Sequence, residues 1–378
     1  MLLPHFLKLN PKTLTPTVFK LLFFGSFIFS ITSLQNPSTK PENNPNAELN
    51  SGISGKFYFQ LRGEPVLMDL NSGNYSFFNK QAWEDDKSNP AMGIAKYYSK
   101  PFPKSDRILI SIRDALNWPE KIGENYSLTL IQDFEGKFYP GLKFKYDLIE
   151  GAEVAPDEKH FAVLREIDEQ WLEVYTFNND FVDGEKVKAN SFKWLPNGRL
   201  IYATDRQLVI TQPNSTKQAQ TINLPSKVGE GKIKYLSASP NGKYVSFALV
   251  YDGTINVSTY SSFWTLNLET NNFHQAATIH QDDLKTGFKY SSWSPNGKWL
   301  AVYQGGFGGS SALNPGGMGQ IYILPFDELQ TYVVSTKVEN RSAEVSLLKR
   351  YHINPYGNEK QSTKIKEDFP NTEFFWLD

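Results

Sequence analysis

Apolar and polar residues alternate with a period of two in short runs along most of the chain, and turn residues separate these runs. KYVSFA (243–248) and KWLAVY (298–303) are two such runs, and each follows directly on the residues SPNG. This alternation is typical of β-strands, and proline followed by Asn-Gly is typical of tight turns. An aromatic or apolar run also precedes each turn, in IKYLSA (233–238) and FKYSSW (288–293). Each copy therefore predicts a strand, a tight turn and a second strand.

The spacing of the copies predicts how the hairpins stack. Weaker copies read LPNGRLIYA and APDEKHFAVL, so the turn prolines are Pro156, Pro196, Pro240 and Pro295, separated by 40, 44 and 55 residues. A hairpin cannot bury its faces alone, and a four-stranded propeller blade takes about 40–45 residues. The sequence therefore predicts a β-propeller in which each copy begins one blade.

The residues between the copies supply the outer strands of the predicted blades. SSFWTLNLET (261–270) and FHQAATI (273–279) follow the third copy, and QIYILPF (320–326) and TYVVS (331–335) follow the fourth. We expect each pair to form the third and fourth strands of its own blade, with Asn and Gly marking the turns.

The two ends of the repeat region complement each other. GKFYFQL (55–61), PVLMDLNSGN (65–74) and YSFFN (75–79) resemble the second to fourth strands of a blade, and TEFFWLD (372–378) resembles the missing first strand. A C-terminal strand that completes the N-terminal blade leaves no long exposed edge. With a further blade in residues 107–144, the prediction is an all-β, six-bladed propeller of four-stranded antiparallel blades over residues 53–378, closed by the C-terminal strand. In it, Phe374, Phe375 and Trp376 are buried.

The repeat resembles that of a known family. WSPNGKWLAVY followed by QIYIL, together with PVLMDLNSG (65–73), is similar to the repeat of the TolB-type six-bladed β-propellers. The resemblance covers roughly residues 53–378 and implies the fold. This repeat is structural, so the resemblance implies little about function. We expect no counterpart of the N-terminal accessory domain of TolB, because only a polar tether precedes the first predicted blade.

Composition excludes several classes of site. The formal net charge is −1, the apolar share is 40%, and the chain has no cysteine. A near-neutral chain lacks the basic excess of a nucleic-acid binder. Without cysteine there is no disulfide framework, thiolate nucleophile or Cys-based zinc site.

The N-terminus has the features of an export signal. Basic residues precede the apolar run LLFFGSFIFSI (21–31), which is shorter than the roughly 20 residues of a spanning helix. We expect residues 1–34 to be a signal peptide or an N-terminal membrane anchor, with membrane proximity through residues 18–34. Residues 35–52 are polar and proline-containing, which predicts a flexible linker.

No catalytic, cofactor-binding or metal-binding residue is predicted. His280, Asp282 and Asp283 form the best metal-like cluster, but a solvated loop between the fifth and sixth blades explains it more simply. The glycine-rich segment 305–319 matches neither a serine-hydrolase elbow nor a P-loop.

Long connections between second and third strands predict the binding face. They are RDALNWPEKIGENY (113–126), VYDGTINVSTYSS (250–262) and the glycine-rich segment, whereas REIDEQ (165–170) and TDRQ (204–207) are short. Long loops on a rigid scaffold commonly carry function. The candidate binding residues are Trp118, Tyr251, Tyr260, Phe307, Ser310 and Ser311.

The resulting hypothesis is an exported propeller of the bacterial cell envelope, in the periplasm or on the membrane face, that binds an envelope protein or acts as a scaffold. The alternative is a propeller enzyme, a lyase or hydrolase, that acts on a glycan or a peptide.

Overall fold

The structure is a computed structural model. Apart from the single residues Asn46 and Leu49, it describes residues 52–61, 64–77, 97–105, 107–113, 126–133, 138–145, 148–166, 170–176, 186–212, 215–228, 230–251, 261–283, 286–305, 310–311, 314–315, 318–351 and 365–378. The regular elements of these residues are β-strands and three short 3-10 helices. The predicted signal segment 1–34 lies outside the described residues.

Strands of the first half of the chain, together with the C-terminal strand β30, form three four-stranded sheets. The first, ordered β3-β2-β1-β30, consists of β1 (Lys56–Leu61), β2 (Glu64–Asp69), β3 (Tyr75–Phe77) and β30 (Phe374–Leu377). The second consists of β4 (Tyr97–Pro101), β5 (Arg107–Arg113), β6 (Tyr126–Asp133) and β7 (Phe138–Lys145). The third consists of β8 (Leu148–Val154), β9 (His160–Glu166), β10 (Gln170–Thr176) and β11 (Val187–Lys188).

The second half forms three more large sheets and two small ones. The fourth sheet consists of β12 (Ser191–Trp194), β13 (Leu200–Ala203), β14 (Gln207–Gln212) and β15 (Ser215–Asn223). The fifth is β16 (Lys232–Ala238), β17 (Tyr244–Val250), β18 (Ser261–Asn267), β19 (Asn272–Ile279) and β25 (Tyr332–Val334). The sixth is β20 (Gly287–Trp293), β21 (Trp299–Gly305), β24 (Met318–Pro325), β26 (Ser346–Leu347) and β29 (Phe369–Pro370). The small sheets pair β22 (Ser310–Ser311) with β23 (Asn314–Pro315), and β27 (Arg350–Tyr351) with β28 (Ile365–Lys366).

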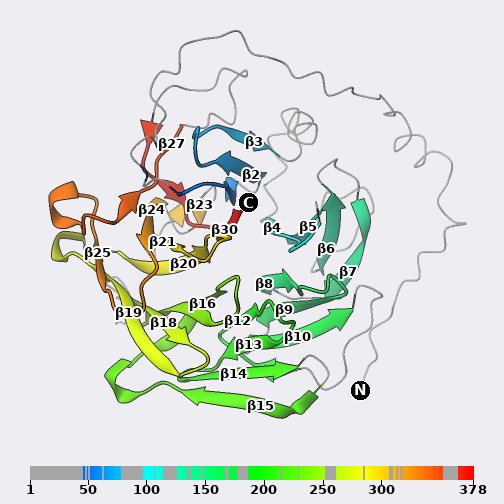
Figure 1. Cartoon of the computed structure of the whole chain (residues 1–378). Coiled ribbons are helices and arrows are strands. Elements are labelled where there is room, and N and C mark those ends of the chain that lie inside the picture. Colours follow the sequence, from blue (N-terminus) through cyan, green and yellow to red (C-terminus); the bar gives the residue numbers. More distant parts are fainter. Residues whose placement is uncertain are drawn as a thin grey trace, which may run out of the picture. The chain divides into compact units, whose positions relative to one another are not determined.

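Apolar layers join consecutive sheets face to face. One layer packs the first sheet on the sixth, and others pack the sixth on the fifth, the fifth on the fourth, the fourth on the third and the third on the second. The inner edge strands β8, β12, β16, β20 and β30 contact one another in sequence, and β4 contacts β8. Figure 1 shows the resulting propeller-like ring of sheets. The sequence prediction of an all-β propeller is confirmed.

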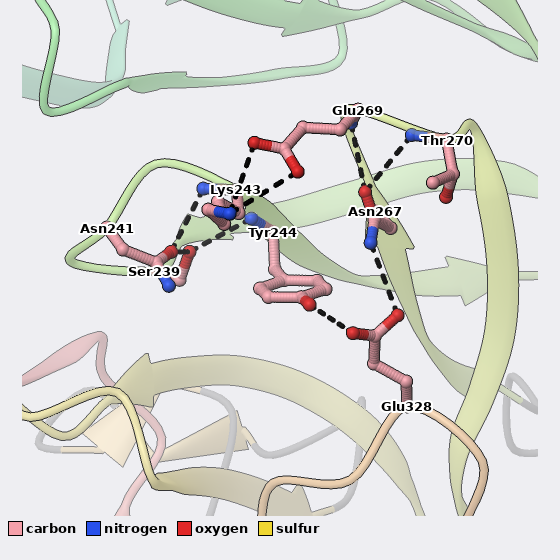
Figure 2. Close-up of polar contacts among 8 residues, drawn as sticks. All are labelled: Ser239, Asn241, Lys243, Tyr244, Asn267, Glu269, Thr270 and Glu328. Atoms are coloured by element: carbon pink, nitrogen blue, oxygen red, sulfur yellow. Dashed lines mark hydrogen bonds and ion pairs between the residues drawn. The ribbon is translucent and has the colours of Figure 1, made fainter.

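The two SPNG copies of the repeat form the same turn. The side chain of Ser239 donates to Asn241 Oδ1 at 2.7 Å, Asn241 accepts from the Lys243 N–H at 3.0 Å, and the Tyr244 N–H donates to Ser239 Oγ at 3.0 Å (Figure 2). Ser294, Asn296, Lys298 and Trp299 repeat these bonds one blade later. Side chains of the motif itself therefore close the turn, and the motif is structural as predicted.

The turn requires a positive φ at its fourth residue. Gly242 and Gly297 both have φ +70°, and the decayed third-sheet copy holds Glu158 at φ +53° instead. A Cβ on Gly297 would meet only Pro240 Cδ, at 3.9 Å, which is ordinary contact. Substitution at this position therefore tests backbone strain without a steric clash.

We expect Gly297→Ala to lower the free energy of unfolding by about 1–2 kcal/mol, because an alanine in the left-handed region strains against its carbonyl. Gly297→Asn should cost less, since asparagine tolerates this region. Urea unfolding followed by circular dichroism measures both. Equal costs for the two variants would show that left-handed strain is not what the glycine relieves.

The C-terminal segment supplies the inner strand of the first sheet. β30 pairs antiparallel with β1 through Phe57↔Trp376 and Phe59↔Phe374. Phe374 and Trp376 are buried, but Phe375 is only half-buried. The burial prediction is therefore wrong for Phe375, because neighbouring residues of a strand face opposite sides of the sheet.

One predicted strand lies in a different sheet. TYVVS was expected to be the fourth strand of the sixth blade, but β25 pairs parallel with β19 of the fifth sheet through Ala277↔Tyr332 and Ile279↔Val334. The fourth strand of the sixth sheet is β26, which pairs with β24. The prediction assumed that strands close in sequence pair, whereas residues 326–345 first cross to the neighbouring sheet. We call residues 326–345 the crossing segment.

Side chains anchor the crossing segment to the fifth sheet. Glu328 accepts hydrogen bonds from the Tyr244 hydroxyl and from Asn267 Nδ2, the latter at 3.2 Å (Figure 2). Burial and the bond to Glu328 raise the pKa of Tyr244 to about 12. Thr331 Oγ1 donates to the Gln275 carbonyl at 2.7 Å. The Thr331 bond satisfies a carbonyl of β19, and the Glu328 bonds reach β17 and β18, so together they hold the crossing segment on the fifth sheet.

Candidate functional site

Three connections between neighbouring strands are much longer than their equivalents. β5 ends at Arg113 and β6 begins at Tyr126, β17 ends at Val250 and β18 begins at Ser261, and β21 ends at Gly305 and β24 begins at Met318. The equivalent connections β1–β2, β9–β10 and β13–β14 span only 62–63, 167–169 and 204–206. All six lie between the second and third strands of their sheets, counted from the inner edge. We call the strand ends that carry them the loop-bearing ends.

All six predicted binding residues fall within these connections. Trp118, Tyr260 and Phe307 lie outside the described residues. Ser310 and Ser311 form β22, which pairs with β23 in a short hairpin inside the glycine-rich segment.

Tyr251, the first residue after β17, is the predicted binding residue with a described side chain. It is half-buried and packs against the apolar layer between the fourth and fifth sheets. Its hydroxyl lies 3.4 Å from Ser262 Oγ. A Cβ on Gly231 would lie 3.2 Å from the Tyr251 ring, so a glycine provides the room for that ring. Tyr251 thus helps to fix the end of the strand from which its loop leaves.

The glycine-rich segment leaves the sixth sheet beneath a buried tyrosine. Gly305 and Gly319 pair across β21 and β24, and a Cβ on either would lie 2.5–2.6 Å from the Tyr303 ring. The ring covers both glycines and is fully buried. An aromatic ring laid over strand glycines restores the packing that they lack. At least these two glycines therefore give the segment a rigid base rather than flexibility.

A group of ion-paired side chains lies on or beside the inner strands. Lys100 Nζ of β4 lies 3.0 Å from Glu373 Oε2 beside β30, and Lys193 of β12 pairs with Glu153 of β8. We call these four residues the lysine–glutamate cluster. The Lys193 and Glu153 side chains are 14% and 12% exposed, and those of Lys100 and Glu373 are 6% and 23% exposed. Four inner strands that are distant in sequence thus meet through paired charges.

The half-buried Phe375 ring lies between the two lysines of the cluster. Lys100 Nζ and Lys193 Nζ lie 5.5 and 5.4 Å from its centroid, within the range of cation–π attraction. Burial acts to lower the pKa of Lys193, but the carboxylates of Glu153 and Glu373 hold that pKa above its ordinary value. Lys193 is therefore charged at neutral pH and stabilises two carboxylates at once.

Sequence analysis missed this cluster because its members are far apart in the chain. One signal was available: Lys100, Glu153 and Lys193 each stand three residues before a proline, at Pro103, Pro156 and Pro196. The same position in the sixth sheet is Ser292, whose Oγ accepts from the Trp376 N–H at 2.8 Å. Glu153 likewise accepts from the Trp194 N–H at 3.3 Å. This position of the repeat thus bonds to the next inner strand.

The metal-like cluster of the sequence is occupied by protein groups. Asp283 accepts from Ser335 Oγ at 2.7 Å and Thr336 Oγ1 at 3.1 Å, and Asp282 pairs with Lys337 Nζ at 3.1 Å. The hydrogen bond and charge of Lys337 hold the pKa of the Asp282 carboxyl below its ordinary value. Within the part of the chain that the structure describes, no group of three or more His, Cys, Asp or Glu could hold a metal ion. Both aspartates instead anchor the crossing segment.

Comparison with known proteins defines the fold. A scan of protein-family models found no match, and a search of curated proteins found none either. Among solved structures, the chain is similar to TolB from Acinetobacter baumannii, with a TM-score of 0.51 and 12% identity over 88% of this chain and 68% of that one. Kuenenia stuttgartiensis hydrazine synthase gives a TM-score of 0.45 at 11% identity, over 74% of this chain and 79% of that one, and no argument rests on it.

The likeness to TolB shows the fold alone, which is that of a β-propeller. None of the helices among the described residues is long and apolar enough to cross a membrane.

Proposed function

We propose that this chain is an exported β-propeller of the cell envelope that binds a protein partner through its loop-bearing ends. One observation carries the proposal: the long connections 114–125, 251–260 and 306–317 all join the second and third strands of their sheets. Long insertions at equivalent strand ends of a rigid scaffold are where binding residues concentrate. The candidate residues Trp118, Tyr251, Tyr260, Phe307, Ser310 and Ser311 stand in or beside these connections.

The propeller that we propose has six blades, one for each four- or five-stranded sheet, and β30 closes its ring. Support for closure comes from the pairing of β30 with β1 and from the Lys100–Glu373 ion pair between β4 and the residue before β30. A closed ring holds all the loop-bearing ends in fixed positions, so that several loops can engage one partner.

The export that we propose rests on the N-terminal sequence, in which basic residues precede the apolar run 21–31. Fractionation of cells that express the full chain tests it. Recovery from the periplasm or the membrane fraction is expected, and recovery from cytosol with residues 1–34 intact would refute it.

Loop shortening tests the binding face. We expect replacement of residues 306–317 by a short Gly-Ser linker to abolish or strongly weaken capture of a partner identified by crosslinking and mass spectrometry in envelope extract. The fold should survive, because Gly305↔Gly319 pairing and the Tyr303 ring lie below the exchanged residues. A thermal melt of each variant checks this.

The matched control changes the opposite ends of the strands. Lys243→Ser and Lys298→Ser alter exposed turn residues at those ends and should leave capture intact. If capture survives the loop exchange but is lost in these turn variants, the partner binds the ends that carry the SPNG turns, and the proposed binding face is wrong.

A further inference from the structure

The outer strand of the fourth sheet turns part of its backbone away from the sheet. β15 is last in the strand order of this sheet and lies on its outer side, away from the inner strand β12 (Figure 1). The Leu224 N–H donates to the Arg206 carbonyl at 3.0 Å, so the backbone of Leu224 faces the β14 side. Hydrogen-bonding directions alternate along an antiparallel strand. The N–H and C=O groups of Thr221 and Asn223 therefore face the outer edge.

β15 is regular along this stretch. Its pairing with β14 runs without a break from Gln220 to Asn223, and its register shift lies on the far side of Gln220, towards Ser215. Gln220, Thr221 and Asn223 are exposed. A bulge protects a strand edge by twisting it away, and this one leaves the stretch from Gln220 onwards straight enough to pair with a further strand.

The fifth sheet shows what an edge in this position can bind. Its outer strand β19 is joined by β25 of the crossing segment through Ala277↔Tyr332 and Ile279↔Val334. Tyr332 and Val334 are buried in the apolar layer between the fifth and sixth sheets. Within the part of the chain that the structure describes, β15 pairs with β14 alone. The same position in the fourth sheet thus offers an edge for an added strand.

A cleft of about 450 Å³ lies beside this edge, a volume typical of ligand pockets. Its lining includes Thr221, Ile222, Asn223, Lys227, Asn271 and Phe273. Ile222 and Phe273 are only 6% and 7% exposed and belong to the apolar layer between the fourth and fifth sheets. The cleft therefore combines apolar surface for a side chain with the strand whose backbone faces outwards.

The charge at the cleft is positive. Lys227 of the 3-10 helix η1 (Ser226–Val228) is exposed, and among the described lining residues it alone is charged. An ammonium group forms charge-assisted hydrogen bonds with a carboxylate. An occupant that carries an acidic side chain close to an apolar one therefore fits this cleft.

We propose that the edge of β15 and the cleft beside it bind an extended acidic segment of a partner protein, which adds to the fourth sheet as a fifth strand. The backbone of this segment exchanges hydrogen bonds with Thr221 and Asn223, as in other cases of strand addition. An aliphatic side chain of the segment packs on Ile222 and Phe273, and a carboxylate pairs with Lys227. This surface uses none of the long connections, so it is separate from the binding face proposed above.

The test selects peptides from a phage-displayed library of random twelve-residue sequences on the immobilised full chain. Fluorescence anisotropy then measures the affinity of the enriched peptides after synthesis. Thr221→Pro should weaken binding by about tenfold or more, because proline lacks the outward N–H, and an edge strand tolerates proline where that N–H faces solvent. Thr221→Val keeps the N–H and should bind like wild type.

The charge of the cleft has its own pair of variants. Lys227→Ser should weaken binding of the enriched acidic peptides by about tenfold, because a hydrogen bond to a charged group is lost. Lys243→Ser changes an exposed turn lysine and should leave the affinity unchanged. A thermal melt of each variant checks its fold.

Hydrogen exchange of the wild-type protein keeps the test decisive if a variant folds poorly. An enriched peptide should slow exchange in residues 219–225, because the N–H groups of Thr221 and Asn223 become bonded. The site is overturned if no peptide is enriched, if Thr221→Pro weakens none of them, or if exchange slows only outside residues 219–225. A dimer of the free chain that Thr221→Pro disrupts would also overturn it, in favour of β15 pairing with a second copy. The loop-exchange test of partner capture is independent of these results, so the two proposals fail separately.

Discussion

Lys193→Met is expected to destabilise the protein by about 3–5 kcal/mol, which is the usual cost of breaking a buried ion pair by removing one partner. The substitution removes the positive charge beside the Glu153 carboxylate. Glu153 is only 9% exposed, and it keeps the hydrogen bond from the Trp194 N–H at 3.3 Å. The substitution also removes the positive charge that is attracted to the Glu373 carboxylate, an attraction that helps to raise the pKa of Lys193 in the folded protein. Urea unfolding at neutral pH measures the loss.

Two matched variants separate charge burial from lost packing. Lys193→Met combined with Glu153→Met removes both charges and should recover most of the stability, because an apolar pair of similar volume replaces a buried ion pair at little cost. Lys243→Met breaks the exposed pair Lys243–Glu269, whose side chains are 51% and 60% exposed, and should cost less than about 1 kcal/mol. A double variant no more stable than the single one would contradict the assignment of the loss to an unpaired charge.

The same pair predicts a pH dependence. The pKa of Lys193 is higher in the folded protein than its ordinary value. Its contribution to stability is therefore complete below the unfolded pKa, about 10.4, and is lost as pH rises through the higher folded pKa. The difference in unfolding free energy between wild type and Lys193→Met should be constant at neutral pH and shrink in strongly alkaline buffer. A difference that grows with alkaline pH would reverse the sign of this linkage.

Deleting residues 374–378 is expected to abolish folding to a soluble monomer or to lower the melting temperature severely. The deletion removes β30, exposes the edge of β1 and uncovers Phe57, which stacks on Phe374 at 5.4 Å and packs on Trp376 at 5.2 Å. Truncating one large buried aromatic costs about 3–5 kcal/mol, and this deletion removes Phe374 and Trp376 together. Solubility, gel filtration and a thermal melt measure the outcome.

Smaller changes in the same strand show which contact matters. Trp376→Phe keeps a ring but loses the bond from Nε1 to the Ser54 carbonyl at 2.8 Å, and should cost only part of the full loss. Removing Asp378 alone takes an exposed residue beyond the strand and should change nothing. A melting curve unchanged by deletion of 374–378 would exclude a stabilising role for β30.

The sequence by itself determined the local units of this protein. SPNG with its preceding aromatic run predicts each hairpin, because the side chains of Ser239 and Asn241 close their own turn within a few residues. The spacing of the turn prolines predicts that the hairpins stack as blades. The N-terminal blade lacks a first strand in the sequence, which predicts that FFWL at the C-terminus pairs with β1. These features depend on residues close together in the chain or on a repeated sequence pattern, so the amino-acid sequence alone predicts them.

The tertiary structure decided what depends on contacts between repeats. The strand β4 belongs to a four-stranded sheet although no SPNG turn follows it. The strand β25 pairs with β19 of the preceding sheet, because a segment from the next repeat satisfies hydrogen-bonding groups at the edge of β19. The lysine–glutamate cluster arises because inner strands far apart in sequence lie next to one another. The spacing of residues within one repeat does not predict these contacts. The physical reason is that the order in which the sheets stack, rather than distance along the chain, places these side chains together.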